Sequence, residues 1–278
     1  MHVEMKIAAV IVTYHPQMED VVRNMASYAN DVDLLVLWDN SEKPEDLSPI
    51  LQAYPKTILH QDHCNAGLPT AYNWAYQLAK EQGCTHLMTM DQDSEFEQFL
   101  SYRSWLEKHD VPGITCVRIN KGVAYDEEEV EIGTACQSGS VFPLAMLEQI
   151  GGFREDLFIA MVDAEMSLRA AEKGYKIIQY NGSNLKHMIG SRRKVKVLGH
   201  HIEVSDYNAL RHYYDSRNRI LLWHEFPNDY DFRGKLHHLA GRMKVMVKIL
   251  LFEDHKCSKV AAIVRGSYNG FRNKAVSY

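Results

Sequence analysis

The first half of the chain alternates short apolar runs with segments of helical periodicity, and this alternation restricts the fold more than any other feature. The apolar runs are typical of strands buried on both faces, and they lie at 6–13, 34–38, 57–60 and 87–91. Segments with the apolar spacing of helices lie between successive runs, at 18–29, 44–54 and 68–82. This order predicts an α/β fold with a mostly parallel, Rossmann-like sheet flanked by helices.

The second half changes character near residue 208. Before that point we expect an acidic surface loop at 125–129, helices at 143–150 and 162–173, and a strand at 175–180. Beyond it the pattern is helical to the C-terminus. We therefore expect one domain over residues 1–207 and a helical C-terminal extension over residues 208–278.

Composition indicates an ordinary soluble enzyme. The 278 residues are 46% hydrophobic and 24% charged, which is typical of globular proteins. No apolar run approaches the ~20 residues that a membrane-spanning helix needs, and the start of the chain lacks the apolar region of a signal peptide. The five cysteines are widely spaced without a CxxC pair, so neither a disulfide framework nor a zinc site is indicated. We expect a cytoplasmic protein.

The net charge of −5 is unevenly distributed along the chain. From Asp231 onward there are ten Lys and Arg against three Asp and Glu, whereas the preceding residues carry 21 against 33. Within this basic tail, the segment Arg242–Phe252 is strongly apolar, and Lys244 and Lys248 stand one helical turn apart. Such a helix suits peripheral contact with the cytosolic face of a membrane. Burial against the first domain and a homodimer interface are the alternatives. We expect no nucleic-acid partner.

Two carboxylates follow the fourth apolar run. Asp91 and Asp93 stand at positions i and i+2, where the predicted strand emerges. Open α/β sheets bind ligands at this carboxyl edge. One carboxylate could reach a ribose hydroxyl and the other a divalent cation, and Mg²⁺ binds through one or two carboxylates together with substrate phosphates. The pattern predicts a nucleotide diphosphate site, with a solvated turn as the alternative.

Five segments in a fixed order carry a resemblance to a known family. They are Ile11–Pro16, Trp38–Ser41, Asn65–Gly67, Asp91–Ser94 and Met161–Glu165. Together they resemble the inverting nucleotide-sugar glycosyltransferases of family 2, and most of all the bacterial rhamnosyltransferase-like branch. The resemblance covers roughly residues 5–220. It implies a GT-A fold, a nucleotide-diphospho-sugar donor, and Mg²⁺ or Mn²⁺ as cofactor.

The donor-binding residues follow from these segments. Thr13 and Tyr14, at the end of the first strand, are expected to hold a pyrimidine ring. Asp39 ends the second strand and could accept a hydrogen bond from the base or ribose, although the segment also suits a plain turn. Asn65 and Gly67 allow the backbone to approach a ligand closely.

The diphosphate and metal residues come from the same comparison. Asp91 is interpreted as the ribose-contacting carboxylate and Asp93 as the metal ligand. His187 lies in a segment that resembles a His-x-x-Gly element near the metal or diphosphate, and a structural histidine is the alternative. Arg217 lies in a Tyr-Tyr-x-x-Arg-Asn segment and could form a fork onto the diphosphate, or else a structural ion pair.

Inverting transfer also needs a base for the acceptor hydroxyl. Asp163 matches the Asp of the family's Asp-x-Glu segment and is the candidate, with a helix N-cap as its alternative. Glu165 is expected to bind acceptor or to orient its neighbours. Ser138 and Gly139 resemble a small-residue segment near the acceptor, and a glycine-containing turn is equally compatible with them.

The resemblance implies transfer of a sugar, with rhamnose as the first candidate, from a dTDP- or UDP-sugar to a hydroxyl of a glycan or lipid-linked glycan acceptor. The setting would be bacterial cell-surface polysaccharide synthesis. One alternative is a nucleotidyltransferase, but the Gly-rich loop such enzymes carry after the first strand is replaced here by Thr13–Pro16. The other is a non-catalytic sugar-nucleotide-binding protein, against which the presence of Asp91, Asp93 and Asp163 argues.

Overall fold

The computed structural model describes residues 4–43, 45–122, 126–188, 193–197, 200–274 and 277–278. The chain forms two compact units. Unit 1 comprises Met1–Glu155 and Val162–His187, and unit 2 comprises Asp156–Met161 and Met188–Tyr278. The two units therefore divide between His187 and Met188, while the expected division into two functional domains after residue 207 stays a prediction.

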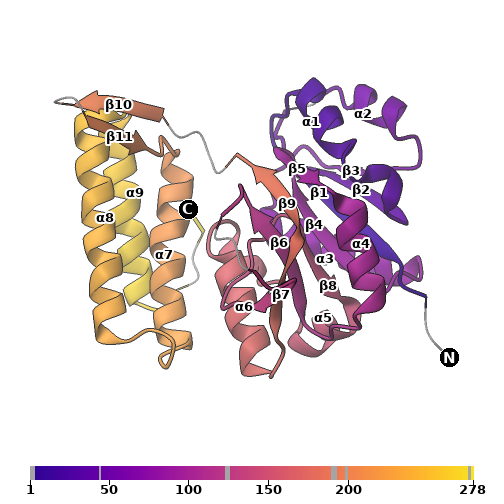
Figure 1. Ribbon diagram of the computed structural model, residues 1–278. Helices are drawn as coiled ribbons and strands as arrows, with labels where there is room; N and C mark the ends of the chain where they lie inside the picture. The colour runs from indigo at the N-terminus through magenta and orange to yellow at the C-terminus, as the bar shows by residue number, and fades with distance from the viewer. Residues whose placement is uncertain (1–3, 44, 123–125, 189–192, 198–199, 275–276) are drawn as a thin grey trace. The chain divides into compact units, whose positions relative to one another are not determined.

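Unit 1 contains a mixed sheet with the strand order β3-β2-β1-β4-β8-β6-β9-β5, and β7 pairs with β9 (Figure 1). Its strands are β1 (Ile7–Thr13), β2 (Leu34–Asp39), β3 (Ile58–Gln61), β4 (His86–Asp91), β5 (Ser94–Glu97), β6 (Ile114–Ile119), β7 (Glu129–Glu131), β8 (Ser140–Pro143) and β9 (Ile177–His187). The four strands from β3 to β4 are parallel, as expected. Beyond β4 the sheet is mixed, because β8 is antiparallel to β4 and to β6 whereas β9 is parallel to β6.

Helices cover this sheet. They are α1 (Met18–Met25), α2 (Ser48–Ala53), α3 (Leu68–Glu81), α4 (Phe99–Lys108), α5 (Leu144–Ile150) and α6 (Val162–Glu172). The first expected helix ends at Met25 and is shorter than predicted, because a turn at 26–28 and a 3₁₀ helix at Ala29–Asp31 follow it. The second begins at Ser48 with Pro49 in its first turn, and the predicted starting residue 44 lies outside the described residues. Of the expected acidic loop, residue 125 also lies outside them, and Glu129 begins β7.

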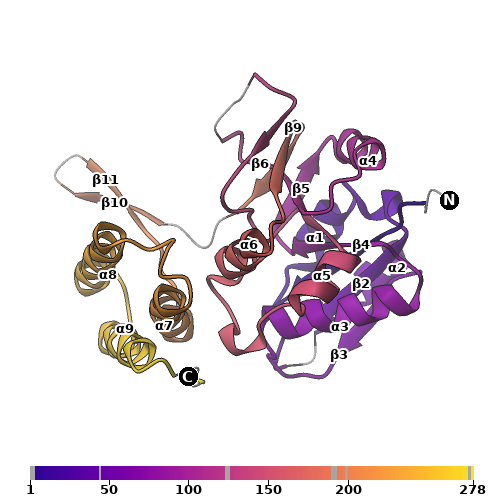
Figure 2. The same ribbon diagram turned by 90° about the horizontal axis from the view of Figure 1, so that it is seen from below.

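The core forms around β1, which is buried along its whole length. Ile7, Ala9 and Ile11 pack in a cluster with residues of α1, α2 and α4. Helix α3 contacts β1, β2 and β4, and buries a row of alanines that includes Ala71 and Ala75. Helices thus lie on both sides of the sheet (Figure 2). Burial of both faces explains why β1 reads as a continuous apolar run.

Unit 2 is mainly helical. It contains a hairpin of β10 (Arg193–Val197) and β11 (His200–Val204), followed by α7 (Ala209–Glu225), α8 (Phe232–Phe252) and α9 (Lys256–Phe271). Helices α7 and α9 pack so closely that a β-carbon at Gly266 would lie 2.3 Å from the backbone oxygen of Tyr213. The helical C-terminal region is confirmed, whereas the hairpin was not predicted. Across the described part of the chain, no helix combines the length and apolarity needed to cross a membrane.

Candidate active site

The carboxyl ends of β1, β2 and β4 meet at one edge of the sheet. Thr13 is opposite Asp39 in the β1–β2 ladder, and Val12 is opposite Asp91 in the β1–β4 ladder. Both pairs are parallel, so the three strands deliver their following loops to the same side. The residues predicted from three distant segments are therefore brought together by the sheet.

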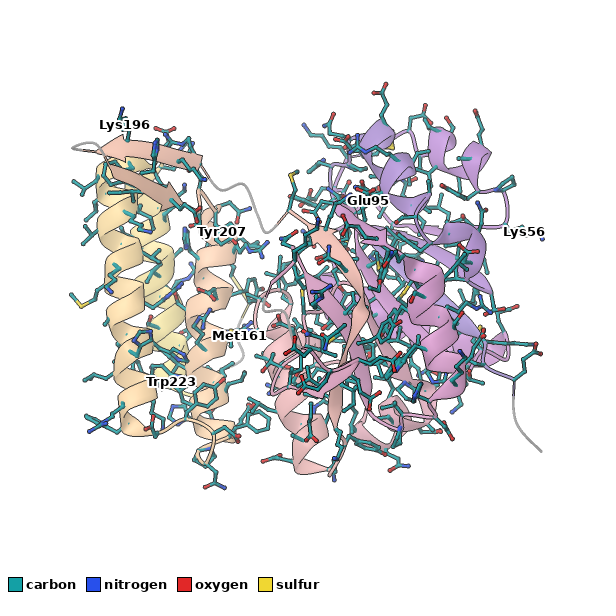
Figure 3. The ribbon with its side chains drawn as sticks, viewed as in Figure 1. Lys56, Glu95, Met161, Lys196, Tyr207 and Trp223 are labelled. Carbon is teal, nitrogen blue, oxygen red and sulfur yellow. The ribbon has the colours of Figure 1, made fainter. Side chains whose placement is uncertain are left out.

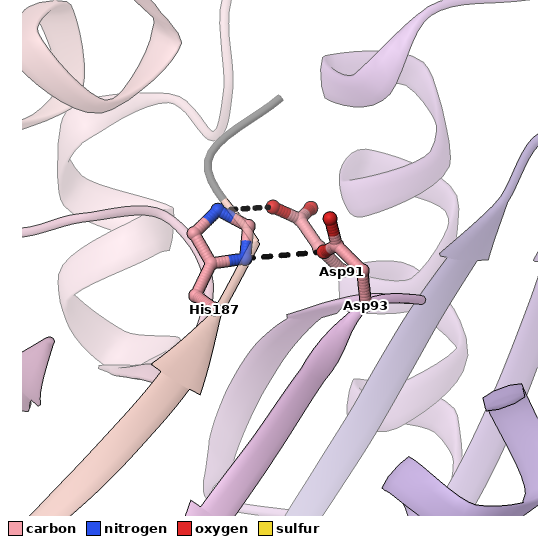
Figure 4. Close-up of side chains that lie close together, drawn as sticks. All are labelled: Asp91, Asp93 and His187. Carbon is pink, nitrogen blue, oxygen red and sulfur yellow. Dashed lines mark ion pairs between the residues drawn. The ribbon is translucent and has the colours of Figure 1, made fainter. Parts of the chain in front are cut away.

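Asp91, Asp93 and His187 converge beyond the end of β4 (Figure 4). His187 Nδ1 lies 3.1 Å from Asp93 Oδ1, and Nε2 lies 3.6 Å from Asp91 Oδ2. His187 reaches this position because β9 pairs antiparallel with β5, which places it opposite Ser94. The sequence motif alone contains the two aspartates, and the pairing of β5 with β9 adds the histidine.

These three side chains fit a divalent cation. One ligand atom from each lies within 4.8 Å of the others, and no second group of three or more His, Cys, Asp or Glu side chains meets this criterion among the residues described. Carboxylate oxygens and an imidazole nitrogen are suitable ligands for Mn²⁺, and the carboxylates also suit Mg²⁺. The donor set is thus chemically appropriate for the metal expected from the sequence.

A chain of hydrogen bonds supports this group from behind. The Asp91 backbone N–H donates to Ser138 Oγ at 3.0 Å, and Ser138 Oγ donates to Ser94 Oγ at 2.7 Å. Ser94 Oγ lies 2.9 Å from His187 Nδ1. Ser138 is fully buried. In these contacts Ser138 orients the Asp–Asp–His group, and its expected contact with acceptor stays a prediction.

Gly139 occupies a position that only glycine fits well. Its φ of +79° lies in the left-handed region, and a β-carbon there would come 3.0 Å from the Leu185 side chain. Its N–H donates to the Thr89 carbonyl at 2.8 Å. The turn therefore holds Ser138 against the end of β4. A role of Gly139 toward acceptor is likewise untested.

Asp39 organises the loop after β2. Its Oδ1 accepts hydrogen bonds from Thr13 Oγ1 at 3.1 Å and from the hydroxyl of Ser41 at 2.7 Å. Its Oδ2 accepts from Gln61 Nε2 at 2.9 Å. The side chain is 1% exposed. Direct contact with a base or ribose stays a prediction, and the observed contacts give Asp39 a part in shaping the loop that would make such contacts.

The loop at 65–67 packs beside that segment. The N–H of Gly67 donates to Asn65 Oδ1 at 3.1 Å, and Gly67 has a φ of +84°. Asn40 Nδ2 donates to the Gly67 carbonyl at 3.3 Å, which joins this loop to the end of β2. Asn65 is needed for the hydrogen bond within the loop, and Gly67 is needed for the positive φ. The structure of the loop therefore explains both residue types.

Tyr14 is the most accessible of the predicted donor residues. Its side chain is 41% exposed, and its hydroxyl donates to Glu42 Oε1 at 3.2 Å. Partial burial and the neighbouring Glu42 carboxylate raise the pKa of the Tyr14 hydroxyl. The next residue, His15, lies 2.9 Å from Glu45 and 3.1 Å from Glu42, and the hydrogen bond to Glu45 raises its pKa.

Gln92, between the two aspartates, has a role that the motif did not predict. Its side-chain amide bonds with both backbone polar groups of Tyr14. The Gln92 carbonyl accepts from Asn24 Nδ2 at 3.0 Å. The loop that carries Asp91 and Asp93 is thereby fixed to the end of β1 and to α1. The sequence signal was present, because an amide side chain carries separate donor and acceptor groups that can pair with a backbone C=O and N–H together.

Asp163 lies in the first turn of α6. The helix begins at Val162, so Asp163 stands one residue inside it and not at the N-cap, and Asp163 Oδ1 lies 2.8 Å from the Ala164 backbone nitrogen. Burial raises the pKa of the Cys136 thiol to about 12, with further contributions from Asp91 and Asp163. Burial and the same two carboxylates raise the pKa of the Tyr72 hydroxyl. Asp163 and Asp91 therefore act electrostatically on one region of unit 1.

Glu165 is buried and forms an ion pair with Arg169 of the same helix. Both carboxylate oxygens accept from the Arg169 guanidinium, at 2.8 and 2.9 Å, and the side chain is 1% exposed. Of the two roles expected for Glu165, these contacts correspond to orientation of its neighbours. Contact with acceptor stays a prediction.

Comparisons with known proteins agree with this geometry. No family model matches the chain. A curated relative, the dTDP-rhamnosyl transferase RfbF of Shigella flexneri, is 26% identical over 238 residues, which cover 78% of this chain and 79% of the relative.

Two solved structures share the fold. One is GalNAc-T7 with UDP, GalNAc and Mn²⁺, with a TM-score of 0.60 and 14% identity over 81% of this chain. The other is TarS of S. aureus, with a TM-score of 0.50 and 14% identity over 96% of this chain. The chain spans 48% and 43% of the length of these two proteins.

The chain resembles a rhamnosyltransferase in sequence and has the GT-A fold. The enzyme class is glycosyltransferase, and the resemblance identified from the five sequence segments is confirmed.

Arg217 is fully buried within unit 2. Its guanidinium lies over the ring of Tyr214 at 4.7 Å and donates to Asn218 Oδ1 at 2.9 Å and to the Asp156 carbonyl. Burial lowers its pKa. These contacts are structural. Binding of a diphosphate by Arg217 stays a prediction, and it would require the side chain to break these contacts.

Two buried polar atoms near the site were missed by sequence reasoning. Tyr72 Oη and Gln137 Oε1 have no hydrogen-bond partner within the described part of the chain. Tyr72 belongs to the buried face of α3, where an aromatic residue reads as ordinary core. Gln137 is the first residue of the small-residue segment that resembles an acceptor-side element, but no role was assigned to its side chain.

Proposed function

We propose that the protein is an inverting, metal-assisted glycosyltransferase that moves a sugar from a dTDP- or UDP-sugar to a hydroxyl of a glycan or lipid-linked glycan. The observation that carries this proposal is the meeting of Asp91, Asp93 and His187 at the carboxyl edge of the sheet. Rhamnose is the first sugar to test, because the curated relative is named a dTDP-rhamnosyl transferase. The Mn²⁺ in the GalNAc-T7 structure supports a divalent metal.

The donor half of the proposed site lies at the strand ends. Asp93 and His187 would hold Mg²⁺ or Mn²⁺, and Asp91 would accept from the ribose. A bound divalent cation would neutralise negative charge on the departing diphosphate. The nucleoside would lie against the ends of β1 and β2 and the loop that follows β3, in contact with Thr13, Tyr14, Asp39, Asn65 and Gly67. The exposure of Tyr14 and the backbone conformation of Gly67 support this placement.

Asp163 would act on the acceptor side. In the proposed step, the acceptor oxygen forms a bond to the anomeric carbon while the bond from that carbon to the diphosphate oxygen breaks, and Asp163 takes the hydroxyl proton. Attack opposite to the leaving group inverts the anomeric configuration. The shared electrostatic influence of Asp163 and Asp91 on Cys136 and Tyr72 supports placement of Asp163 near the donor half.

The acceptor contacts and cellular setting are the broader part of the proposal. Ser138, Gly139 and Glu165 would line or shape the acceptor side, and residues 1–207 would form the catalytic domain. The reaction would take place at the cytosolic face of a bacterial membrane, in the synthesis of a cell-surface polysaccharide.

A donor-hydrolysis and transfer assay tests the proposal. The purified protein is incubated with dTDP-rhamnose, UDP-sugars and Mn²⁺, and release of nucleoside diphosphate is followed with and without a chelator. We expect release that depends on one nucleotide-sugar and is abolished by the chelator. Thermal stabilisation by donor without any turnover, across a panel of glycan acceptors, would favour a binding protein. Formation of pyrophosphate from a nucleoside triphosphate and a sugar phosphate would favour a nucleotidyltransferase.

A further inference from the structure

Helix α8 exposes an apolar face along its whole length. The side chains recur every three or four residues, so they form one stripe on the helix surface. The stripe consists of Phe232, Leu236, Leu239, Met243, Val247 and Leu250, with exposed fractions from 37% to 77%. Helices of globular proteins ordinarily turn such a stripe toward a core. Here the buried side is opposite, with Ile249 fully buried.

All the charged side chains of α8 are positive. The helix has no Asp or Glu, and its basic residues are Arg233, Lys235, Arg242, Lys244 and Lys248. Two of them hold the helix on its own bundle. Arg242 pairs with Asp215 of α7, and Lys248 Nζ donates to the Glu203 carbonyl at 2.8 Å.

The remaining basic residues flank the apolar stripe. At 3.6 residues per turn, Arg233 and Lys244 fall on one side of it and Lys235 falls on the other. Arg233 and Lys244 are exposed. An apolar strip with positive edges is the arrangement of helices that lie in the plane of a membrane interface.

We propose that this face of α8 binds an anionic lipid surface, with the helix axis parallel to the surface. The charge pattern selects this partner over a second copy of the chain, because pairing α8 with itself would bring positive edges together. The neighbouring helix α9 has the same character. It exposes Val264, Tyr268 and Phe271 and also contains no Asp or Glu. Since α8 contains 21 residues, its stripe covers roughly 30 Å, enough for several headgroups. The inference does not depend on the proposed reaction.

Vesicle co-sedimentation of the full chain tests the proposal. Vesicles of phosphatidylcholine with phosphatidylglycerol are compared with vesicles of phosphatidylcholine alone. We expect binding to the anionic vesicles only, with affinity that falls as salt is raised. Arg233→Gln/Lys244→Gln should weaken binding by about fivefold for each charge removed. Met243→Ser/Val247→Ser should weaken it by about tenfold or more, because both side chains lose contact with the lipid.

Matched controls lie in unit 1. Lys56→Gln/Lys108→Gln removes two exposed positive charges, and Leu100→Ser removes an apolar side chain that is 59% exposed (Figure 3 shows Lys56). These variants should bind vesicles as the unaltered chain does, and circular dichroism should show that all variants are folded. Equal binding to neutral and anionic vesicles, or no effect of either α8 double variant, would overturn the proposal. A dimer interface would also overturn the proposal. In that case the unaltered chain would sediment as a dimer, and Met243→Ser/Val247→Ser would sediment as a monomer without any change in vesicle binding.

Discussion

The side-chain amide of Gln92 pairs with the backbone of Tyr14 through two hydrogen bonds. Gln92 Oε1 accepts from the Tyr14 N–H at 2.8 Å, and Gln92 Nε2 donates to the Tyr14 carbonyl at 3.2 Å. The pair joins the loop of Asp91 and Asp93 to the loop that would hold the nucleoside. A single residue therefore couples the metal and nucleoside halves of the proposed donor site.

Replacement of Gln92 should weaken donor binding more than chemistry. Gln92→Ala removes both hydrogen bonds, each contributing about 0.5–1.5 kcal/mol, so we expect KM for the donor to rise by roughly 5- to 150-fold at most while kcat changes little. Gln92→Glu keeps an acceptor for the Tyr14 N–H but removes the donor to the Tyr14 carbonyl. Its KM for the donor should therefore lie between those of the unaltered chain and Gln92→Ala. Steady-state kinetics at saturating acceptor measures both parameters. A fall in kcat alone would place Gln92 in the chemical step instead.

Asp93→Ala should abolish metal-dependent donor binding. The substitution removes one of the three side chains that could hold the cation, so we expect affinity for the nucleoside diphosphate to fall roughly tenfold or more in Mn²⁺. Affinity measured without metal should stay the same, which titration calorimetry can show. Glu95→Ala is the matched control, because it removes a carboxylate of the same segment that pairs with Lys186 (Glu95 is labelled in Figure 3). Unchanged affinity of Asp93→Ala in Mn²⁺ would contradict the assignment.

Asp163→Asn should abolish transfer and leave donor binding nearly intact. Asparagine keeps the size of the side chain but removes the basic carboxylate, and a positioned base contributes about 10²–10⁴ in rate. Single-turnover transfer and donor titration separate the two effects. Near-normal turnover would remove Asp163 as the base.

Glu165→Gln provides the contrast on the same helix. The substitution removes the negative charge of the buried pair with Arg169, so we expect a loss of about 1–3 kcal/mol in the free energy of unfolding. The turnover of folded protein should change far less than in Asp163→Asn. Urea denaturation and transfer assays on the same preparations test this difference.

Arg217 can be assigned by comparing stability with donor affinity. Arg217→Lys keeps the charge but loses the planar group that lies over Tyr214 and reaches Asn218. We expect a loss of about 2–4 kcal/mol in unfolding free energy and no change in donor affinity of the folded fraction. The opposite result, weaker donor binding at unchanged stability, would support the contact with a diphosphate.

His86 should make the protein less stable in mild acid. Burial lowers its pKa to about 4, whereas an unfolded histidine has a pKa of about 6.5. Between these values the unfolded state binds more protons than the folded state, so stability falls as the pH decreases from about 6.5 to 4, by at most about 3 kcal/mol. Urea denaturation at pH 7 and pH 4.5 measures the loss. His86→Gln, which does not titrate, should show a smaller difference between the two pH values.

The sequence by itself determined the elements that depend on local burial. The apolar runs of β1, β2 and β4 were recognisable because both faces of each strand are covered, and the aspartates after β4 were recognisable because they end such a run. The carboxyl edge then followed, since parallel strands deliver their loops to one side. The periodicity of apolar residues indicates which faces of a strand or helix are buried. These predictions therefore did not require knowing which other elements cover those faces.

The tertiary structure decided which distant residues meet. His187 joins Asp91 and Asp93 only because β9 pairs with β5, a contact between Ser94 and His187 that spans 93 positions. The antiparallel insertion of β8 and the burial of Arg217 also arise from packing between segments far apart in sequence. The apolar residues of α8 predicted a helix, but which of them lie in the bundle and which are exposed depends on how α7 and α9 pack. Such contacts are set by the shapes and charges of several elements at once, and no single stretch of sequence contains that information.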